Sequence, residues 1–262
     1  MNSSTYKNTI AILLLLLTAT ASLHAQTAPT PAPNADPDRP VSWVKILPNV
    51  ASDQKRIWLF PAKLTKPRIL WPTLAVIGTT AALVALDPKT APWFKNNGTF
   101  TGFNNAFSSS NTQWGTLAVP IAFYGVGLAT KNKNLKSTAL LAAEAVGDSE
   151  ILTTVMKDIS NRTRPAAIGT GQSYSNTWFN SSGSFLRGHG SFPSGHSIAA
   201  FSVATVISRR YGKQHKWLPY VSYGLASAVA FSRVSLSSHF VSDIFMGGAL
   251  GYSISRFAVL RQ

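Results

Sequence analysis

Long apolar runs alternate with short polar connections over most of the chain. Beyond residue 41 there are six such runs, at 69–86, 114–130, 135–156, 197–208, 217–231 and 244–260. None shows the strict apolar and polar alternation of a half-buried strand, and Ala, Gly, Ser and Thr are frequent in them, as close helix packing requires. The pattern predicts an all-α fold in which each run forms a helix.

The apolar runs are compatible with a membrane-embedded bundle and with a soluble one. Most are shorter than the roughly 20 apolar residues that a membrane span needs, and the third contains Glu144, Asp148 and Glu150. A soluble bundle with buried acids would fit these features. Charged residues, however, make up 13% of the chain, about half of the ~25% usual in soluble proteins, while 45% are hydrophobic. We therefore expect a bundle that is embedded in a membrane.

The first 68 residues differ from the rest. Lys7, an apolar run at 10–17 and small residues ending at Ala25 are typical of a secretory signal peptide, here residues 1–25, or of an uncleaved anchor. The next residues, to Pro40, are rich in Pro, Ala, Asp and Asn and indicate a disordered linker. We expect residues 26–68 to form a Pro-rich linker and a basic juxtamembrane segment, followed by one helical catalytic domain at 69–262.

The chain is strongly basic, with 24 Lys and Arg against 9 Asp and Glu and a formal charge of +15. This favours anionic partners, but no nucleic-acid reader motif is present, so nucleic acid is not expected as a partner. Basic residues in the connections at 131–136 and 209–216 and at the C-terminal end indicate cytoplasmic ends. The polar connections at 166–192 and 235–239 then face the periplasm of a bacterial-type inner membrane, whether or not the signal is used. A soluble periplasmic protein is the alternative.

Three polar stretches lie at the ends of the predicted helices. They contain Lys157 with Arg164-Pro165, then Pro193-Ser194-Gly195-His196, then Ser232-Arg233 with His239 and Asp243. The three cations in these stretches can balance a phosphate dianion and stabilise the extra charge of a five-coordinate transition state.

The second stretch opens a predicted helix. The first N–H groups of a helix have no intrahelical partner and form an anion site, and Gly195 lets the anion approach closely. The hydroxyl of Ser194 can add a donor. The chain has no cysteine, which excludes disulfides, thiolate catalysis and Cys-ligated zinc.

His239 and Asp243 are four residues apart, so on a helix they share a face and Asp243 can accept a hydrogen bond from one ring nitrogen. The other nitrogen is then a nucleophile toward phosphorus, and the carboxylate stabilises the charge that develops. His196, on another helix, can protonate the leaving alkoxide and later activate water.

In order and spacing, the three stretches resemble the signature of the superfamily of type 2 phosphatidic acid phosphatases and vanadium haloperoxidases. The resemblance covers 157–243. It implies a six-helix bundle in which His239 is the nucleophile, Asp243 its orienting partner and His196 the general acid. It also implies a phosphate site, formed by Lys157, Arg164, Ser194, Gly195 and Arg233. The signal-like N-terminus is more typical of the soluble acid phosphatases of the superfamily than of its lipid phosphatases.

We predict a metal-independent phosphatase that hydrolyses a phosphate monoester or pyrophosphate, on a lipid, through a phosphohistidine, without a cofactor. A secreted non-specific acid phosphatase, a vanadate-dependent haloperoxidase and a non-catalytic phospholipid-binding protein are the alternatives. A serine hydrolase is excluded because Phe192 stands where the nucleophile elbow requires Gly. A hydrolytic zinc site typically has a motif such as H-E-x-x-H, and the sequence lacks this motif.

Overall fold

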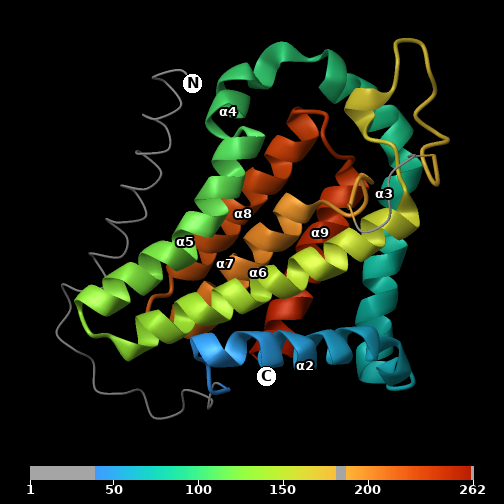
Figure 1. Cartoon of the computed structure of the whole chain (residues 1–262). Helices are drawn as coiled ribbons and strands as arrows, with labels where there is room; N and C mark the ends of the chain where they lie inside the picture. The colour runs from blue at the N-terminus through green and yellow to red at the C-terminus, as the bar shows by residue number, and fades with distance from the viewer. Residues whose placement is uncertain (1–38, 181–186, 261–262) are drawn as a thin grey trace.

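The computed structural model describes residues 39–180 and 187–260, and within these ranges it is helical and has no strand (Figure 1). The predicted all-α class is confirmed. The α-helices in these ranges are α2 (Ile46–Trp58), α3 (Pro67–Asn96), α4 (Thr101–Ala106), α5 (Ser109–Ala129), α6 (Lys133–Ser160), α7 (Gly195–Tyr211), α8 (Leu218–Ser235) and α9 (Val241–Ser253). A π-helical turn, Ile254–Val259, continues α9, and short 3-10 helices lie at Trp43–Lys45, Phe60–Lys63, Gly98–Phe100 and Pro165–Ala167.

Each predicted apolar run lies within a helix. The first run falls in α3, the next four in α5 to α8, and the last in α9 and its π-helical turn. The predicted signal peptide and most of the predicted linker lie outside the described residues. Two helices were not predicted, α4 and α2, and α2 lies in the segment that we expected to be a linker and a basic stretch.

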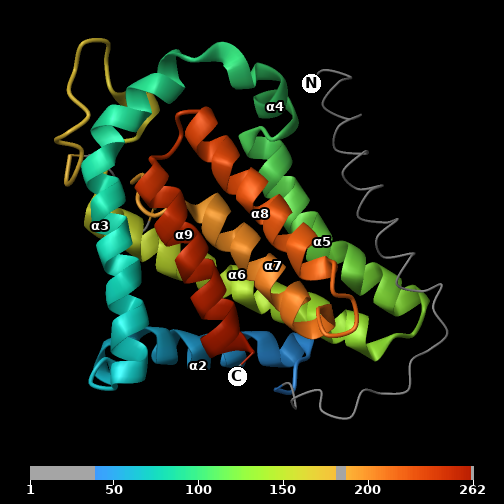
Figure 2. The same ribbon diagram turned by 180° about the vertical axis from the view of Figure 1, so that it is seen from behind.

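Helix α7 lies at the centre of the bundle and contacts α6, α8 and α9 (Figures 1 and 2). Its Ile198 and Val206 side chains are fully buried. Glycines on α9 allow this close packing, because a Cβ at Gly251 would lie 2.3 Å from the Ile198 carbonyl oxygen. At Gly247 it would lie 2.8 Å from the Ser194 carbonyl oxygen. The small residues thus bring the first turn of α7 close to the middle and the last turn of α9.

Side-chain caps fix where several of these helices begin. The hydroxyl of Ser108 accepts from the Asn111 N–H before α5, and the side-chain oxygen of Asn132 accepts from the Leu135 N–H before α6. Such caps satisfy N–H groups that the first turn leaves unpaired. Helix α6 ends at Asn161, whose backbone is left-handed (φ 40°), so the chain turns sharply there toward the site.

Helix α2 explains the buried acids of α6. Glu144 accepts hydrogen bonds from Arg39 and, over 2.7 Å, from Asn49, while Asp148 accepts from Gln54 over 2.9 Å. Arg39 also pairs with Asp53 of α2. Buried carboxylates require such partners. Two of the three acids that argued for a soluble bundle, Glu144 and Asp148, are therefore the attachment site of α2, while Glu150 is exposed.

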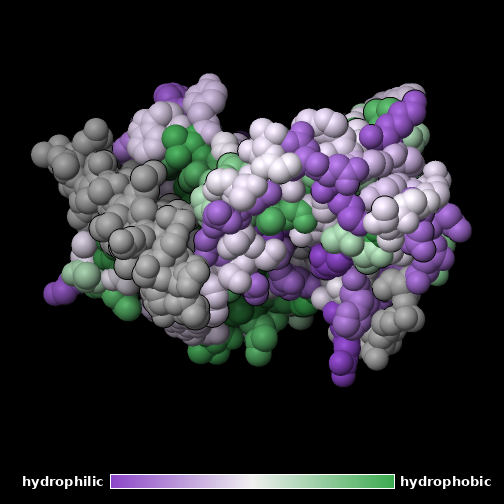
Figure 3. Space-filling model, turned by 90° about the horizontal axis from the view of Figure 1, so that it is seen from above, coloured by the Kyte–Doolittle hydropathy of each residue, from purple (hydrophilic) through white to green (hydrophobic). Residues whose placement is uncertain are grey.

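Helix α3 stands apart from the other helices by its composition and exposure. Among the residues that the structure describes, it is the helix that is both long and apolar enough to cross a membrane, and only 6% of its most apolar stretch is buried. It packs along α9 at one side of the bundle (Figure 2). The end of the molecule seen from above in Figure 3 is largely polar, with apolar side chains gathered toward its margin. The core helices lie beside this exposed apolar helix.

Candidate active site

Lys157 lies in the last turn of α6, under a loop that crosses it. A Cβ at Gly190 would lie 2.5 Å from the Lys157 carbonyl oxygen, so only glycine fits there. The Gly188 N–H donates to Asp158 over 2.9 Å and holds the same loop to α6. The amine of Lys157 approaches the first turn of α7, since a Cβ at Gly195 would lie 3.7 Å from its Nζ atom.

Arg164 follows α6 and precedes the 3-10 helix Pro165–Ala167. Within the described part of the chain, the side chains of Arg164 and Lys157 form no hydrogen bond with protein groups. Both are half-buried. Two cations without hydrogen-bond partners at one site favour the binding of an anion.

The first turn of α7 is arranged as the sequence predicted. Ser194 is the N-cap; its hydroxyl accepts from the Ser197 hydroxyl over 2.9 Å and from the Ser197 N–H over 3.4 Å. Its own N–H donates to the Asp243 carbonyl oxygen over 3.1 Å. Gly195 and His196 occupy the next two positions, where N–H groups lack intrahelical partners.

Arg233 and His196 meet at the connection between α4 and α5. Arg233 is buried and donates over 2.8 Å to the Ser109 hydroxyl and over 2.5 Å to the Phe107 carbonyl oxygen. The Nε2 atom of His196 lies 3.3 Å from the Ser109 carbonyl oxygen. A carbonyl oxygen only accepts, so this nitrogen carries the proton. Ser109, which the sequence analysis missed, therefore contacts the predicted general acid and one arginine of the phosphate site.

His239 does not share a helical face with Asp243, and this expectation was wrong. Helix α9 begins at Val241, and His239 lies in the turn before it, after Ser237 with a left-handed backbone (φ 53°). Its Nδ1 atom lies 2.7 Å from the Ser191 carbonyl oxygen and 3.5 Å from the Asp243 carboxylate. Asp243 instead caps α9, because its carboxylate accepts from the Phe240 N–H over 2.9 Å. The turn, not helical spacing, brings the two residues together.

The Ser191 contact fixes the tautomer of His239. Since the carbonyl oxygen can only accept, Nδ1 carries the proton and Nε2 keeps its lone pair. The Ser191 hydroxyl donates to the Asp243 carboxylate over 2.5 Å, so one residue contacts both members of the pair. Ser191 lies outside the three predicted stretches, and nothing in its sequence position indicated this contact.

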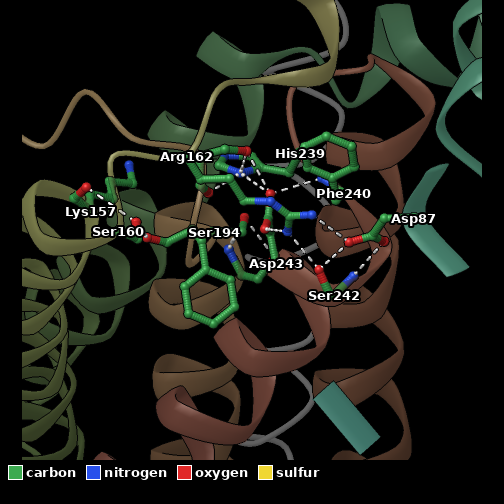
Figure 4. A network of polar contacts seen from close by, with 12 residues as sticks. Asp87, Lys157, Ser160, Arg162, Ser194, His239, Phe240, Ser242 and Asp243 are labelled. Atoms are coloured by element: carbon green, nitrogen blue, oxygen red, sulfur yellow. Dashed lines mark hydrogen bonds and ion pairs between the residues drawn. The ribbon is translucent and has the colours of Figure 1, made fainter. Parts of the chain in front are cut away.

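Arg162 is the most connected residue of the site, although the sequence analysis did not select it (Figure 4). Its guanidinium donates to Asp243 over 2.6 Å and to Asp87 over 2.7 Å, and also to the hydroxyls of Ser242 and Thr177. Only a planar group with several donors can make these bonds at once. Its position two residues before Arg164 was a signal that the analysis could have used.

Aromatic rings cover Arg162 on two sides. Its guanidinium carbon lies 4.5 Å from the centroid of the Trp178 ring and 3.9 Å from that of Phe240. Such cation and π contacts stabilise a charge that is shielded from water. Asp87 comes from α3 and also accepts from the Ser242 hydroxyl. Arg162 thus connects α3, the end of α6 and the first turn of α9.

The surroundings change the protonation of the site residues that lie beyond the apolar runs. Burial lowers the pKa of His239, while the neighbouring Asp243 opposes this change. Burial also lowers the pKa of His196 to about 4, and the Arg233 charge adds to the effect. The pKa of Lys157 falls to about 8, again through burial and then through Arg164. At neutral pH both imidazoles are therefore uncharged in the structure, and Lys157 is mostly protonated.

Comparison with known proteins points to one family. Residues 136–262 match the family model of the PAP2 superfamily. A stretch of 61 residues is 38% identical to the lipid A 1-phosphatase of Porphyromonas gingivalis, a match that covers 23% of this chain and only 14% of that protein. A crystal structure of a transmembrane PAP2 type phosphatidylglycerolphosphate phosphatase from Bacillus subtilis is similar over 82% of this chain and 92% of that one, with 20% identity and a TM-score of 0.40. A structural likeness this distant defines neither activity nor substrate.

The matched part of the chain contains every site residue that the sequence analysis selected. This match confirms the resemblance that the three polar stretches indicated.

Proposed function

We propose that this chain is a phosphatase that hydrolyses a phosphate monoester or pyrophosphate on a lipid, without a metal, through a phosphohistidine on His239. The observation that carries the mechanism is the 2.7 Å contact between His239 Nδ1 and the Ser191 carbonyl oxygen, which leaves Nε2 with its lone pair. Family membership and the cations at the site support the same chemistry.

In the first step, Nε2 of His239 attacks phosphorus and the bond from phosphorus to the leaving oxygen breaks. His196 donates a proton to that oxygen. Lys157, Arg164 and Arg233, with the first N–H groups of α7, hold the equatorial oxygens. In the second step, His196 removes a proton from water, the water oxygen attacks phosphorus, and the bond to Nε2 breaks. The products are inorganic phosphate and either the free alcohol, from a monoester, or the lipid monophosphate, from a pyrophosphate.

His196 must be protonated to act as the acid, although burial and the Arg233 charge favour its neutral form. A phosphate dianion held by Arg233 and Lys157 offsets the positive charges that lower the pKa of His196. Binding of the substrate therefore raises this pKa and prepares the acid for the first step.

Two features support a lipid substrate and a membrane location. The side chains around His239, between α3 and the turn before α9, are mainly apolar and include Ala91, Phe94 and Val234. Helix α3, which contributes Ala91 and Phe94, is long, apolar and largely exposed. We propose that the bundle lies in a bacterial inner membrane as a multi-pass protein, with the site facing the periplasm.

The test is phosphate release by purified protein with EDTA present. The panel is phosphatidic acid, phosphatidylglycerol phosphate, lipid A, undecaprenyl pyrophosphate and the soluble p-nitrophenyl phosphate. We expect turnover of a lipid, and loss of at least about three orders of magnitude in His239→Ala. His215→Ala is the matched control, because His215 lies between α7 and α8, outside the site. Equal turnover of the soluble ester would favour a secreted acid phosphatase.

Two further outcomes would remove the proposal. Absence of all phosphate release, together with bromide oxidation after vanadate is added, would indicate a haloperoxidase, and lipid binding without turnover would indicate a binding protein. The phosphohistidine is tested separately, by acid-labile labelling of the protein from a phosphate-labelled substrate. Labelling that persists in His239→Ala would overturn the assignment of the nucleophile.

A further inference from the structure

The side of α2 that faces the bundle engages polar residues. Its buried residue is an acid, Asp53, with an exposed fraction of 0%. The polar side chains of Asn49 and Gln54 also point into the protein, where they donate to Glu144 and Asp148 of α6. The side of α2 that faces the bundle therefore makes these polar contacts, and Ile57 packs there against the hydrophobic core.

The outer side is apolar. Val44 and Leu47 have exposed fractions of 86% and 79%, and Trp43, Trp58 and Leu59 are exposed as well. A soluble surface helix presents polar residues outward and apolar residues inward. The inner polar contacts hold α2 in an orientation in which Leu47 and Trp58 stay exposed, beside Lys55 and Arg56. An apolar environment covers these apolar side chains.

The exposed charged residues beside this apolar surface are all basic. The stretch 41–70 contains a single acid, Asp53, and that residue is buried. Basic residues around α2 and the corner that follows it are exposed, namely Lys45, Lys55, Arg56, Lys63, Lys66 and Arg68. Exposed Trp and Leu beside Lys and Arg are typical of helices that lie in the interface of anionic lipid.

The position of α2 fits this environment. It runs crosswise to α3 at the foot of that helix in both views (Figures 1 and 2). The short 3-10 helix Phe60–Lys63 forms the corner between them. Helix α2 also contacts the π-helical turn after α9, whereas His239 and Asp243 lie at the other end of α9. A helix at the foot of a membrane span, running across its axis, lies along the membrane surface.

We propose that α2, with residues 43 and 44 before it and the corner at 59–63 after it, is an interfacial helix that lies in the surface of an anionic bilayer. Its apolar side enters the boundary between headgroups and acyl chains, and its basic residues contact anionic headgroups. The contacts with Glu144 and Asp148 fasten the bundle to this helix. The inference rests on the proposed membrane location but not on catalysis.

The test uses the absence of cysteine from the chain, which makes any introduced thiol unique. Val44→Cys and Leu47→Cys receive a nitroxide label in the full chain, in nanodiscs of phosphatidylcholine and phosphatidylglycerol. Gln214→Cys, an exposed polar position between α7 and α8, is the control. We expect the labels at 44 and 47 to collide more with oxygen than with a nickel chelate, at a depth of roughly 5–10 Å, and the control to show the reverse.

Labels at 44 and 47 that are as open to the nickel chelate as position 214 would show a water-exposed helix and overturn the proposal. Labels shielded from both reagents would show a protein cover, and would also overturn it. The measurement needs no turnover. A lipid-exposed result in a protein without phosphatase activity would therefore sustain this inference while removing the proposed function.

The basic residues are tested by Lys55→Gln with Arg56→Gln. The comparison is Lys131→Gln, in the connection between α5 and α6, with Lys133→Gln, at the start of α6. In anionic nanodiscs, the first pair should move the label at 44 toward water, and added salt should reduce the difference. The second pair should leave the label unmoved. Equal effects of both pairs, or no effect of the first, would contradict the role of headgroup charge.

Discussion

The guanidinium of Arg162 and the carboxylate of Asp243 form an ion pair of 2.6 Å, and their side chains are exposed by only 1% and 0%. The pair joins the chain just after α6 to the first turn of α9, where Asp243 also caps the helix. It fixes the carboxylate that lies beside His239. Asp87 holds the other side of the same guanidinium.

Arg162→Lys should lower kcat by about tenfold or more while KM changes by less than about twofold. Lysine keeps the charge, but it has no planar group that reaches Asp87 and Asp243 together. Arg162 holds the carboxylate and does not contact phosphate, so substrate binding should be spared. The measurement is steady-state phosphate release, with a thermal melt to show that the variant is folded.

Asp87→Asn is the companion variant. It keeps one oxygen that can accept from Arg162 and Ser242, so kcat should fall less than in Arg162→Lys. A larger loss in Asp87→Asn, or an unchanged kcat in Arg162→Lys, would show that this network does not position Asp243.

The acid limit of the pH profile should reflect His239. Its neutral form attacks phosphorus, and burial lowers its pKa below the ordinary 6.5. Protonation of His239 therefore occurs only at lower pH, and the acid-side decline of kcat/KM should begin only below pH 6.5. The groups that act on His239 are Asp243, which raises the pKa, and Arg164 and Lys157, which lower it. His196 also lies close enough to interact with it.

Arg164→Gln removes one of the positive charges that lower the pKa of His239. The acid limit of the variant's pH profile should lie at higher pH than that of the unchanged protein. Ionisation of the substrate is the same for both proteins, so a difference between their pH profiles reports a changed pKa of a group in the enzyme. A shift to lower pH would exclude His239 as the titrating group.

His196→Asn should distinguish substrates by their leaving groups. For an alkyl phosphate, loss of the general acid should reduce kcat/KM by about 10²–10⁴-fold. For p-nitrophenyl phosphate the loss should be much smaller, because p-nitrophenolate leaves without a proton. Rapid mixing with the soluble ester should also show a burst of p-nitrophenol, since the second step still lacks its base. Equal losses on both substrates would argue against His196 as the acid.

The contact between α7 and α9 depends on glycine. In Gly251→Ala, the new Cβ would lie 2.3 Å from a backbone oxygen of Ile198, so the helices must separate. We expect a loss of about 1–3 kcal/mol in the free energy of unfolding, seen as a lower melting temperature in detergent. In Gly224→Ala, in α8, the new Cβ has nothing within 4 Å, so this variant should not lower the melting temperature. Similar melting temperatures for both would show that α7 and α9 are packed less closely.

The sequence by itself determined the class of fold and pointed to most residues of the candidate site. Apolar runs with many small residues predicted every helix of the central bundle, because helix packing imposes that pattern locally. The polar stretches predicted that Lys157, His196 and His239 lie in one site, and the structure brings the three residues close to one another at helix ends. Such signals are local along the chain and need no knowledge of distant contacts.

Tertiary structure alone decided how these residues are held. Asp87 lies 75 residues before Arg162, and Asp243 lies 81 residues after it, so no local pattern joins them. The tautomer of His239 depends on a backbone carbonyl at Ser191, which carries no side-chain signal. Helix α2 escaped prediction for a related reason. Its polar residues are buried against acids of α6, about 95 residues away, so its pattern became interpretable only when its partner was in place.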